Sequence, residues 1–265
     1  MTGLMTGKRG LVMGVANDHS IAWGIAQALH SQGAELAFTY QGEAFGKRVE
    51  PLAKSVGSDI LLPCDVEDIS TVDAVFAALK EKWGKIDFLV HAIAFSDKNE
   101  LKGKFADTSR KNFTKTMVIS CFSFVEISKR AAALMPDGGS IITLTYGGST
   151  RVMPNYNVMG VAKAALESAV RYLAGDYGPQ GIRVNAISAG PMRTLAGAGI
   201  GDARAMFNYQ AAHAPLRRTI TLEEVGGAGL YLLSPLSSGV TGEIHYVDSG
   251  YNIISMPRPE DLVKL

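Results

Sequence analysis

Strand-like and helix-like segments alternate along almost the whole of this 265-residue chain. Short apolar runs bounded by glycine or proline are followed by amphipathic stretches of helical length. Strands joined through helices run parallel, and right-handed crossovers place helices on both faces of the sheet. We therefore predict one α/β domain, residues 1–265, with a single doubly wound parallel sheet of about seven strands. The expected strands are residues 9–13, 35–40, 59–64, 88–92, 140–145, 183–188 and 243–247, and the expected helices are residues 21–31, 43–56, 71–82, 112–134, 157–177 and 222–233.

Charge and composition exclude several classes of function. Lysine and arginine number 26 and aspartate and glutamate 25, so no basic field draws the chain to nucleic acid or to an anionic membrane surface. No run approaches the roughly 18 apolar residues of a membrane-spanning helix. Residues 1–10 lack the apolar core of a secretory signal. We therefore expect a cytoplasmic protein with no nucleic-acid or membrane partner.

The cysteines and histidines give no sign of a disulfide or a metal site. Cys64 and Cys121 form no CxxC pair and are expected to be reduced, packed thiols. The five histidines are scattered and form no HxxxH pair, so no metal site is expected.

A glycine-rich turn follows the first expected strand and leads into the first expected helix. Gly14 permits a tight turn, the helix N-terminus offers unpaired N–H groups, and Gly24 permits close packing of the helix on the sheet. Ser20 is placed to cap the helix or to contact a phosphate. This turn suits a dinucleotide pyrophosphate. The spacing is not GxGxxG, however, and an ordinary glycine turn with a serine cap has the same pattern.

Two polar residues that follow the second and third strands bear on the nucleotide. Dinucleotide folds place an acidic residue after the second strand for NAD, or a basic one nearby for NADP. Gln41 stands there, and an amide can hydrogen-bond a hydroxyl but cannot neutralise a phosphate. Lys47 and Arg48 are expected on a solvated helix face, so the sequence favours NADH. Asp65 could accept a hydrogen bond from the adenine amino group or cap its own loop.

The second half of the chain carries the most specific pattern, Tyr156-x6-Lys163. Residues i and i+7 of a helix lie on one face, about 10.5 Å apart along the axis. Lys163 could bind ribose hydroxyls and favour the ionised form of Tyr156. Tyr156 could hydrogen-bond a substrate oxygen that gains negative charge. The structural alternative is a helix-face tyrosine with a snorkelling lysine.

Together these motifs resemble the short-chain dehydrogenase/reductase superfamily, which implies a Rossmann-type sheet. The main branch of that superfamily has Tyr-x3-Lys, which would need tyrosine where this chain has Met159, and it has serine where Tyr146 stands. The chain instead resembles the NADH-dependent enoyl-acyl-carrier-protein reductases of bacterial fatty-acid synthesis. The resemblance rests on the Tyr-x6-Lys spacing, on Tyr146, and on the segments GVA…SIAWGIA, AELAFTYQ, PNYNVMG and RVNAISAGPMRTLA. The similarity runs from about Gly7 to Gly250.

The resemblance implies NAD (NADH) as cofactor, an enoyl-acyl carrier protein as substrate and a homotetramer. It implies that an NADH hydride adds to C3 of an enoyl thioester. The catalytic residues it implies are Tyr146, Tyr156 and Lys163. Cofactor contacts are implied for Gly14, Ser20, Ile21, Gln41, Asp65, Val66, Ile93, Lys163, Met192, Arg193, Thr194, Leu195 and Ala196, and substrate contacts for Ser96, Tyr146, Tyr156, Met159 and Ile200.

A substrate-loop region is expected at about residues 194–210. Its first part is rich in glycine and alanine, which supply few side chains to anchor it. Ile200, Met206 and Phe207 are apolar enough to close over an acyl chain, so we predict a mobile gate. The alternative is a small helix packed permanently on the body. Residues 201–205 carry fewer basic side chains than expected beside a carrier protein.

Two other functions stay open. One is a short-chain enzyme that acts on a ketone or alcohol, against which the missing Tyr-x3-Lys argues. The other is a non-catalytic nucleotide sensor or scaffold, against which the presence of both Tyr156 and Lys163 argues. A hydrolase is excluded because the chain has no GxSxG elbow.

Overall fold

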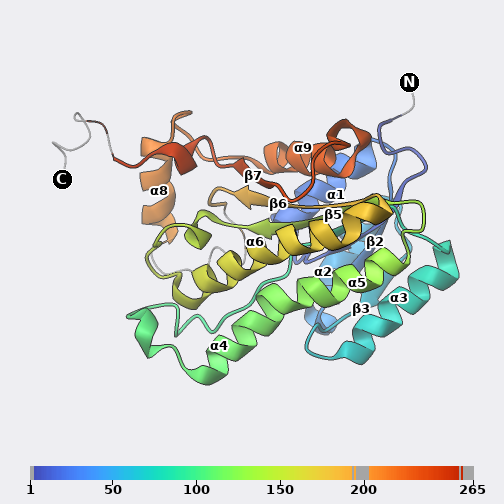
Figure 1. The fold of residues 1–265 in the computed structure, drawn as a ribbon, viewed down its shortest axis with the longest axis horizontal. Helices are drawn as coiled ribbons and strands as arrows, with labels where there is room; N and C mark the ends of the chain where they lie inside the picture. Colours follow the sequence, from blue (N-terminus) through green and yellow to red (C-terminus); the bar gives the residue numbers. More distant parts are fainter. Residues whose placement is uncertain (1–2, 193, 195–202, 257, 259–265) are drawn as a thin grey trace.

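One parallel sheet organises the molecule (Figure 1). The computed structural model describes residues 3–192, 194, 203–256 and 258. Within these residues seven strands pair in the order β3-β2-β1-β4-β5-β6-β7, which confirms the predicted Rossmann-type doubly wound sheet. The strands are β1 (Arg9–Met13), β2 (Glu35–Tyr40), β3 (Leu61–Pro63), β4 (Phe88–His91), β5 (Gly139–Thr145), β6 (Ile182–Ala189) and β7 (Ile244–Val247).

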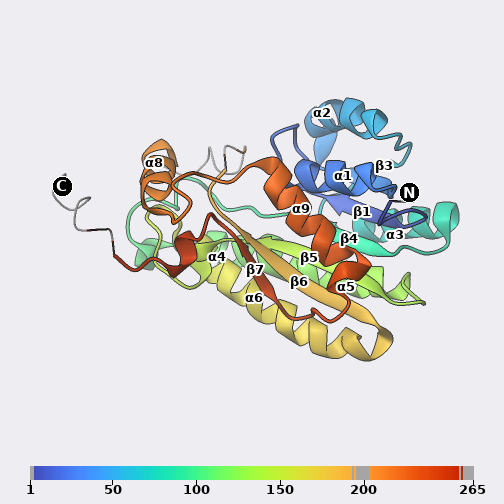
Figure 2. The ribbon, with the colours of Figure 1, turned by 90° about the horizontal axis from the view of Figure 1, so that it is seen from above.

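Helices cover both faces of this sheet, as expected (Figure 2). Alternate residues of a strand point to opposite faces. In β1, Leu11 and Met13 therefore pack with α3, α5 and α6, whereas Val12 packs with α1, α2 and α9. The helices are α1 (Ile21–Ser31), α2 (Gly42–Ser55), α3 (Ile69–Trp83), α4 (Arg110–Met117), α5 (Ser123–Ala133), α6 (Asn157–Tyr177), α8 (Ala203–His213) and α9 (Leu222–Leu233).

The expected continuous helix 112–134 is wrong in one respect. A π-helical segment, Val118–Phe122, separates α4 from α5. Serine side chains in this stretch bond to backbone groups and so compete with the regular helix pattern. Ser120 Oγ donates to the carbonyl of Phe95 (3.0 Å) and accepts from its N–H (2.9 Å), and Ser123 Oγ donates to the carbonyl of Ile119 (2.7 Å). The wider turn thus ties the helix to the loop after β4.

The third strand is also shorter than expected, because it lies at the sheet edge. It pairs with β2 alone, through three residues, and ends at Pro63. The two cysteines are buried free thiols, as predicted, and burial raises the pKa of Cys64 to about 11. None of the helices in the described part of the chain has the length and apolar character needed to cross a membrane.

The order of the strands places the site. The chain winds outward from β1 in one direction to β3 and from β4 in the other direction to β7. Ligands of such sheets bind beyond the carboxyl ends of the strands, where the order reverses. Here that point lies between β1 and β4, whose following residues are Gly14 and Ala92.

Candidate active site

A cavity of about 400 Å³ opens at this switch point. Its walls come from the turns after β1, β4, β5 and β6 and from the helices α6 and α8. Most of the residues singled out from the sequence therefore meet in one place, although they are far apart in the chain. Those that line the cavity are Gly14, Ser20, Ile21, Ile93, Ser96, Tyr146, Tyr156, Met159, Lys163, Met192 and Thr194.

The glycine turn is held in a tight shape by backbone contacts. Gly14 has φ of +98°, and a Cβ on it would lie 2.1 Å from the carbonyl oxygen of Ala92. Only glycine allows the ends of β1 and β4 to approach so closely. The turn after Gly14 therefore lines the cavity close to the end of β4.

Two expectations about this turn need correction. Ser20 stands at the N-cap of α1, but its side chain makes no capping bond. Ser20 Oγ accepts instead from the N–H groups of Ala16 (3.0 Å) and Asn17 (3.1 Å), which closes the turn on itself. Gly24 permits close packing of α1 on α9 rather than on the sheet, because a Cβ on Gly24 would lie 2.8 Å from the carbonyl oxygen of Leu222.

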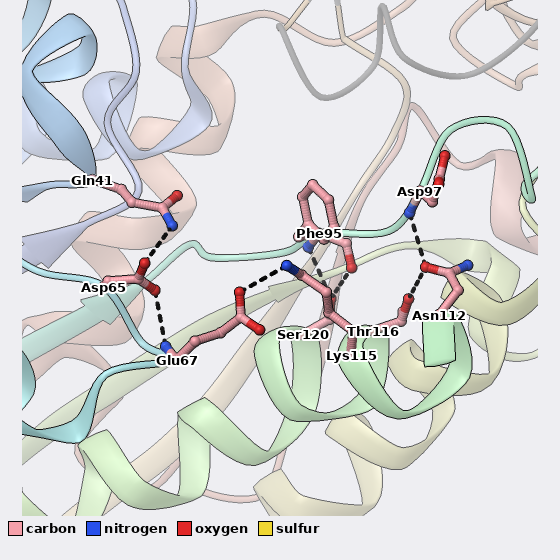
Figure 3. Close-up of polar contacts among 9 residues, drawn as sticks. All are labelled: Gln41, Asp65, Glu67, Phe95, Asp97, Asn112, Lys115, Thr116 and Ser120. Atoms are coloured by element: carbon pink, nitrogen blue, oxygen red, sulfur yellow. Dashed lines mark hydrogen bonds and ion pairs between the residues drawn. The ribbon is translucent and has the colours of Figure 1, made fainter. Parts of the chain in front are cut away.

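Gln41 and Asp65 lie next to each other beyond the cavity lining (Figure 3). Gln41 Nε2 donates to Asp65 Oδ2 (3.0 Å), and Asp65 Oδ1 accepts from the N–H of Glu67 (2.9 Å). Asp65 therefore braces its own loop, which was one of its two expected roles. Lys47 and Arg48 are exposed, as predicted. Val66 is half-buried against the core.

Tyr156 and Tyr146 form the apolar wall of the cavity. Their rings meet edge to face, with centroids 5.2 Å apart and planes at 75°. Burial raises the pKa of Tyr156 far above its ordinary value, with smaller contributions from Tyr146 and Glu167. Burial, Tyr251 and Asp248 raise the pKa of Tyr146 to about 12. Both phenols are therefore protonated at neutral pH and can donate hydrogen bonds.

Lys163 stands seven residues after Tyr156, about two helical turns along, and is equally buried. Its Nζ donates to the carbonyl oxygen of Leu144 (2.7 Å) at the end of β5. Burial lowers the pKa of Lys163 to about 8, against the raising effects of Cys121 and Glu167. Burial dominates the pKa of Tyr156 here and disfavours the ionised form that Lys163 was expected to favour.

A buried pair behind Lys163 was missed in the sequence. Thr145 Oγ1 donates to Glu167 Oε1 (2.7 Å), and both residues are buried. Thr145 lines the cavity and follows Leu144, the residue to which Lys163 bonds. Glu167 stands four residues after Lys163, at helical spacing among the apolar positions Ala162, Leu166 and Val170 of α6. A carboxylate at such a position was the signal that could have identified it.

Ser96 belongs to a network that ties the loop after β4 to α4. Figure 3 shows the contacts of this loop that involve Phe95 and Asp97. The side-chain oxygen of Asn112 accepts from the N–H of Asp97 (3.0 Å), and Thr116 Oγ1 donates to Ser96 Oγ (3.0 Å). Lys115 binds Glu67 (2.9 Å) and lies 5.1 Å from the ring centre of Phe95. The loop that carries the predicted substrate contact is therefore held at several points.

Four of the predicted site residues lie outside the described residues: Arg193, Leu195, Ala196 and Ile200. Most of the glycine-rich part of the expected gate lies outside them as well. The part that is described forms α8, from which Met206 and Phe207 reach the cavity. The gate stays a prediction.

Comparison with known proteins agrees with this geometry. A family model described as "Enoyl-(Acyl carrier protein) reductase" matches residues 14–252. The chain belongs to this family. The enoyl-[acyl-carrier-protein] reductase [NADH] 2 of Rhizobium meliloti (strain 1021) is 76% identical over 99% of this chain and 98% of its own length.

Solved structures of the family have the same fold. FabI from Candidatus Liberibacter asiaticus is 63% identical and superposes with a TM-score of 0.95 over 97% of this chain and 100% of that one. The enoyl-(acyl-carrier-protein) reductase from Anaplasma phagocytophilum, solved in complex with NAD, is 56% identical. Its TM-score is 0.94 over 97% of this chain and 98% of that one.

Proposed function

We propose that this chain is an NADH-dependent enoyl-acyl-carrier-protein reductase of bacterial fatty-acid synthesis. The observation that carries the proposal is the meeting of the glycine turn, Tyr156 and Lys163 around one cavity. A dinucleotide and an acyl chain both need such a cavity. The 76% identity to a reductase named for NADH supports the same reaction and cofactor.

The residues present fit a nicotinamide dinucleotide. An ammonium group has three N–H donors, and Lys163 gives one of them to Leu144, which leaves two for ribose hydroxyls. Gly14 and Ser20 would border the pyrophosphate, and Ile21 and Ile93 would flank the nucleotide. Gln41 would face the adenosine ribose, where its amide favours a hydroxyl over a phosphate. We propose the other cofactor contacts on the family resemblance alone.

The chemistry follows from the protonated state of Tyr156. When bound, NADH supplies a hydride to C3 of the enoyl group. The electron pair of the C2–C3 double bond then moves toward the thioester, and negative charge collects on the thioester oxygen. A neutral Tyr156 donates a hydrogen bond to that oxygen, and this bond strengthens as the charge develops. A proton added at C2 completes the saturated acyl product.

The remaining side chains position the reactants. Lys163 holds the ribose and so fixes the nicotinamide beside the substrate. Met159 and Ser96 would border the acyl chain. Tyr146 lines this cavity and a smaller one of about 60 Å³ behind it, so it separates the substrate from the polar groups around Asp248. This separation keeps water away from the developing charge.

We further propose that the chain acts in the cytoplasm as a homotetramer, with enoyl-acyl carrier protein as its substrate and residues 1–265 forming one catalytic domain. No part of the proposed reaction requires a metal, a nucleic acid or a membrane.

A labelling experiment tests the function. The enzyme is given NADH that carries deuterium at the transferred position, together with an enoyl thioester. Deuterium should appear at C3 of the saturated product, and deuterium at C2 would contradict the mechanism. Ketone substrates and NADPH are assayed in parallel. Faster reduction of a ketone would favour a ketone or alcohol oxidoreductase, and tight NADH binding without turnover of any substrate would favour a sensor.

A further inference from the structure

A strongly basic segment, residues 98–111, borders the cavity on the side of α4. It contains five basic residues and two carboxylates, in a chain whose net charge is only +1. All five basic side chains are exposed. This basic segment therefore concentrates positive charge at one place on an almost neutral protein. Its basic residues are Lys98, Lys102, Lys104, Arg110 and Lys111.

Within the part of the chain that the structure describes, these charges are not neutralised by ion pairs. By contrast, Lys115, which follows the segment in α4, forms an ion pair with a carboxylate, and so do Lys54 and Lys85 elsewhere in the protein. Among the described residues, no basic side chain of the basic segment has such a partner. Its own Glu100 is occupied by the N–H (2.7 Å) and the hydroxyl (2.9 Å) of Ser109. The positive charge is thus available to an outside partner.

The basic segment is anchored beside the catalytic machinery. Lys98 and Leu101 line the cavity, and Leu101 is buried against Tyr156 and Met159. The side-chain amide of Asn157, next to Tyr156, donates to the carbonyl of Gly103 (3.3 Å). A partner bound to this segment would therefore stand at a fixed place relative to the reacting thioester.

The described part of the opposite rim lacks comparable charge. Helix α8 carries one arginine, Arg204, and no lysine. Figure 1 shows α8 and the segment that leads into α4 at the same end of the molecule, on either side of the cavity end of the sheet. Among the described residues of these two rims, the excess of unpaired positive charge lies on the basic segment.

We propose that the basic segment is the surface on which the acyl carrier protein docks, through an acidic face of that protein. This inference rests on the function proposed above and names the contact surface for its substrate. Charge complementarity of this kind raises the association rate and fixes the orientation of the partner. Phe105, which follows Lys104 in the same segment and is 47% exposed, offers an apolar contact beside these charges.

The test uses the double variant Lys102→Glu/Lys104→Glu, since neither lysine lines the cavity. Three enoyl thioesters of equal chain length are compared with NADH: one on acyl carrier protein, one on coenzyme A, and one on N-acetylcysteamine, which has neither protein nor phosphate. The matched control is Lys80→Glu/Lys82→Glu, which makes the same charge change on exposed residues at the far end of α3.

We expect kcat/KM for the carrier-protein substrate to fall by about tenfold or more, through KM, because steering contributes factors of this size. The N-acetylcysteamine and coenzyme A thioesters should react as with the unchanged enzyme, and the control should match it throughout. Added salt should slow the unchanged enzyme on the carrier-protein substrate more than it slows the variant.

Other outcomes overturn the docking surface. Equal losses on all three thioesters would mean that the segment only shapes the cavity. Losses on carrier protein and coenzyme A alone would mean that it binds phosphate groups. A loss for Arg204→Glu, with none for the double variant, would place docking on α8. Failure of the proposed function itself would appear separately, as no reduction of the N-acetylcysteamine thioester by the unchanged enzyme.

Discussion

At the scale of single residues, Tyr156 and Lys163 have different environments and should fail in different ways. Tyr156→Phe removes one hydroxyl from a wall that stays packed, so turnover should fall by about 10²–10³-fold with unchanged NADH affinity. Lys163→Ala removes the group proposed to hold the ribose, so NADH affinity should fall clearly. Fluorescence titration with NADH and steady-state kinetics separate the two effects. A reversal of the two phenotypes would show that the roles are assigned wrongly.

The charge on Lys163 gives a second prediction at this scale. Because burial lowers the pKa of Lys163 to about 8, the ammonium form is complete only at lower pH. NADH affinity should therefore weaken as the pH rises through about 8, where the neutral amine makes a weaker hydrogen bond. The measurement is the dissociation constant of NADH on both sides of this pH. A dissociation constant that does not vary over this range would contradict the role.

Glu167 should act on this titration as a positioning residue, through Lys163. Its charge raises the pKa of Lys163, so Glu167→Gln should move the midpoint of the NADH affinity to lower pH. Glutamine can still accept the hydrogen bond from Thr145, which keeps the packing. Glu167→Asp keeps the charge and should restore the midpoint. If Glu167→Gln alters stability but leaves the midpoint in place, Glu167 has only a structural role.

At the scale of elements, the contact between α1 and α9 depends on glycine. A Cβ on Gly226 would lie 2.6 Å from the carbonyl oxygen of Gly24, which is backbone and cannot move aside cheaply. Gly226→Ala should therefore destabilise the protein by about 1–3 kcal/mol. Gly227→Ala, one position along, meets nothing within 4 Å and should be neutral or stabilising by up to about 1 kcal/mol. Denaturant unfolding compares the two variants.

The elements also indicate what a sequence can and cannot predict. The bounds of β1, β2, α1, α6 and α9 follow from apolar periodicity and from the glycines and polar residues that flank them, and all five were predicted correctly. Contacts between distant segments leave no such pattern. The bond between Gln41 and Asp65, and the one between Ser120 and Phe95, join residues 24 and 25 positions apart. The role of Ser20 likewise depends on how its turn folds back.

At the scale of the whole molecule, large apolar side chains are exposed on one helical layer. This layer consists of α4, the π-helical segment and α6. Phe122 is 52% exposed, and Phe113, Val161 and Tyr172 are also exposed. We expect this layer to be covered by another copy of the chain in the proposed homotetramer. Light scattering should give four times the 28.2 kDa chain mass. Phe122→Lys should give a smaller species, whereas Phe45→Lys, on the opposite layer, should not.

The π-helical segment sets the orientation of α5 relative to α4. In a regular helix, residues 112 and 124 would point about 120° apart. Through the wider turn, Asn112 and Ser120 both bond to the loop after β4, while Phe124 is already buried in the core. Because one turn of π-helix takes about one residue more than one turn of α-helix, deletion of one residue from the segment would restore the regular winding and leave α5 facing the core. The extra residue therefore lets the helix bond to the loop after β4 without turning α5 away from the core, and its deletion would disturb the contact between Ser120 and Phe95 while α5 stays packed.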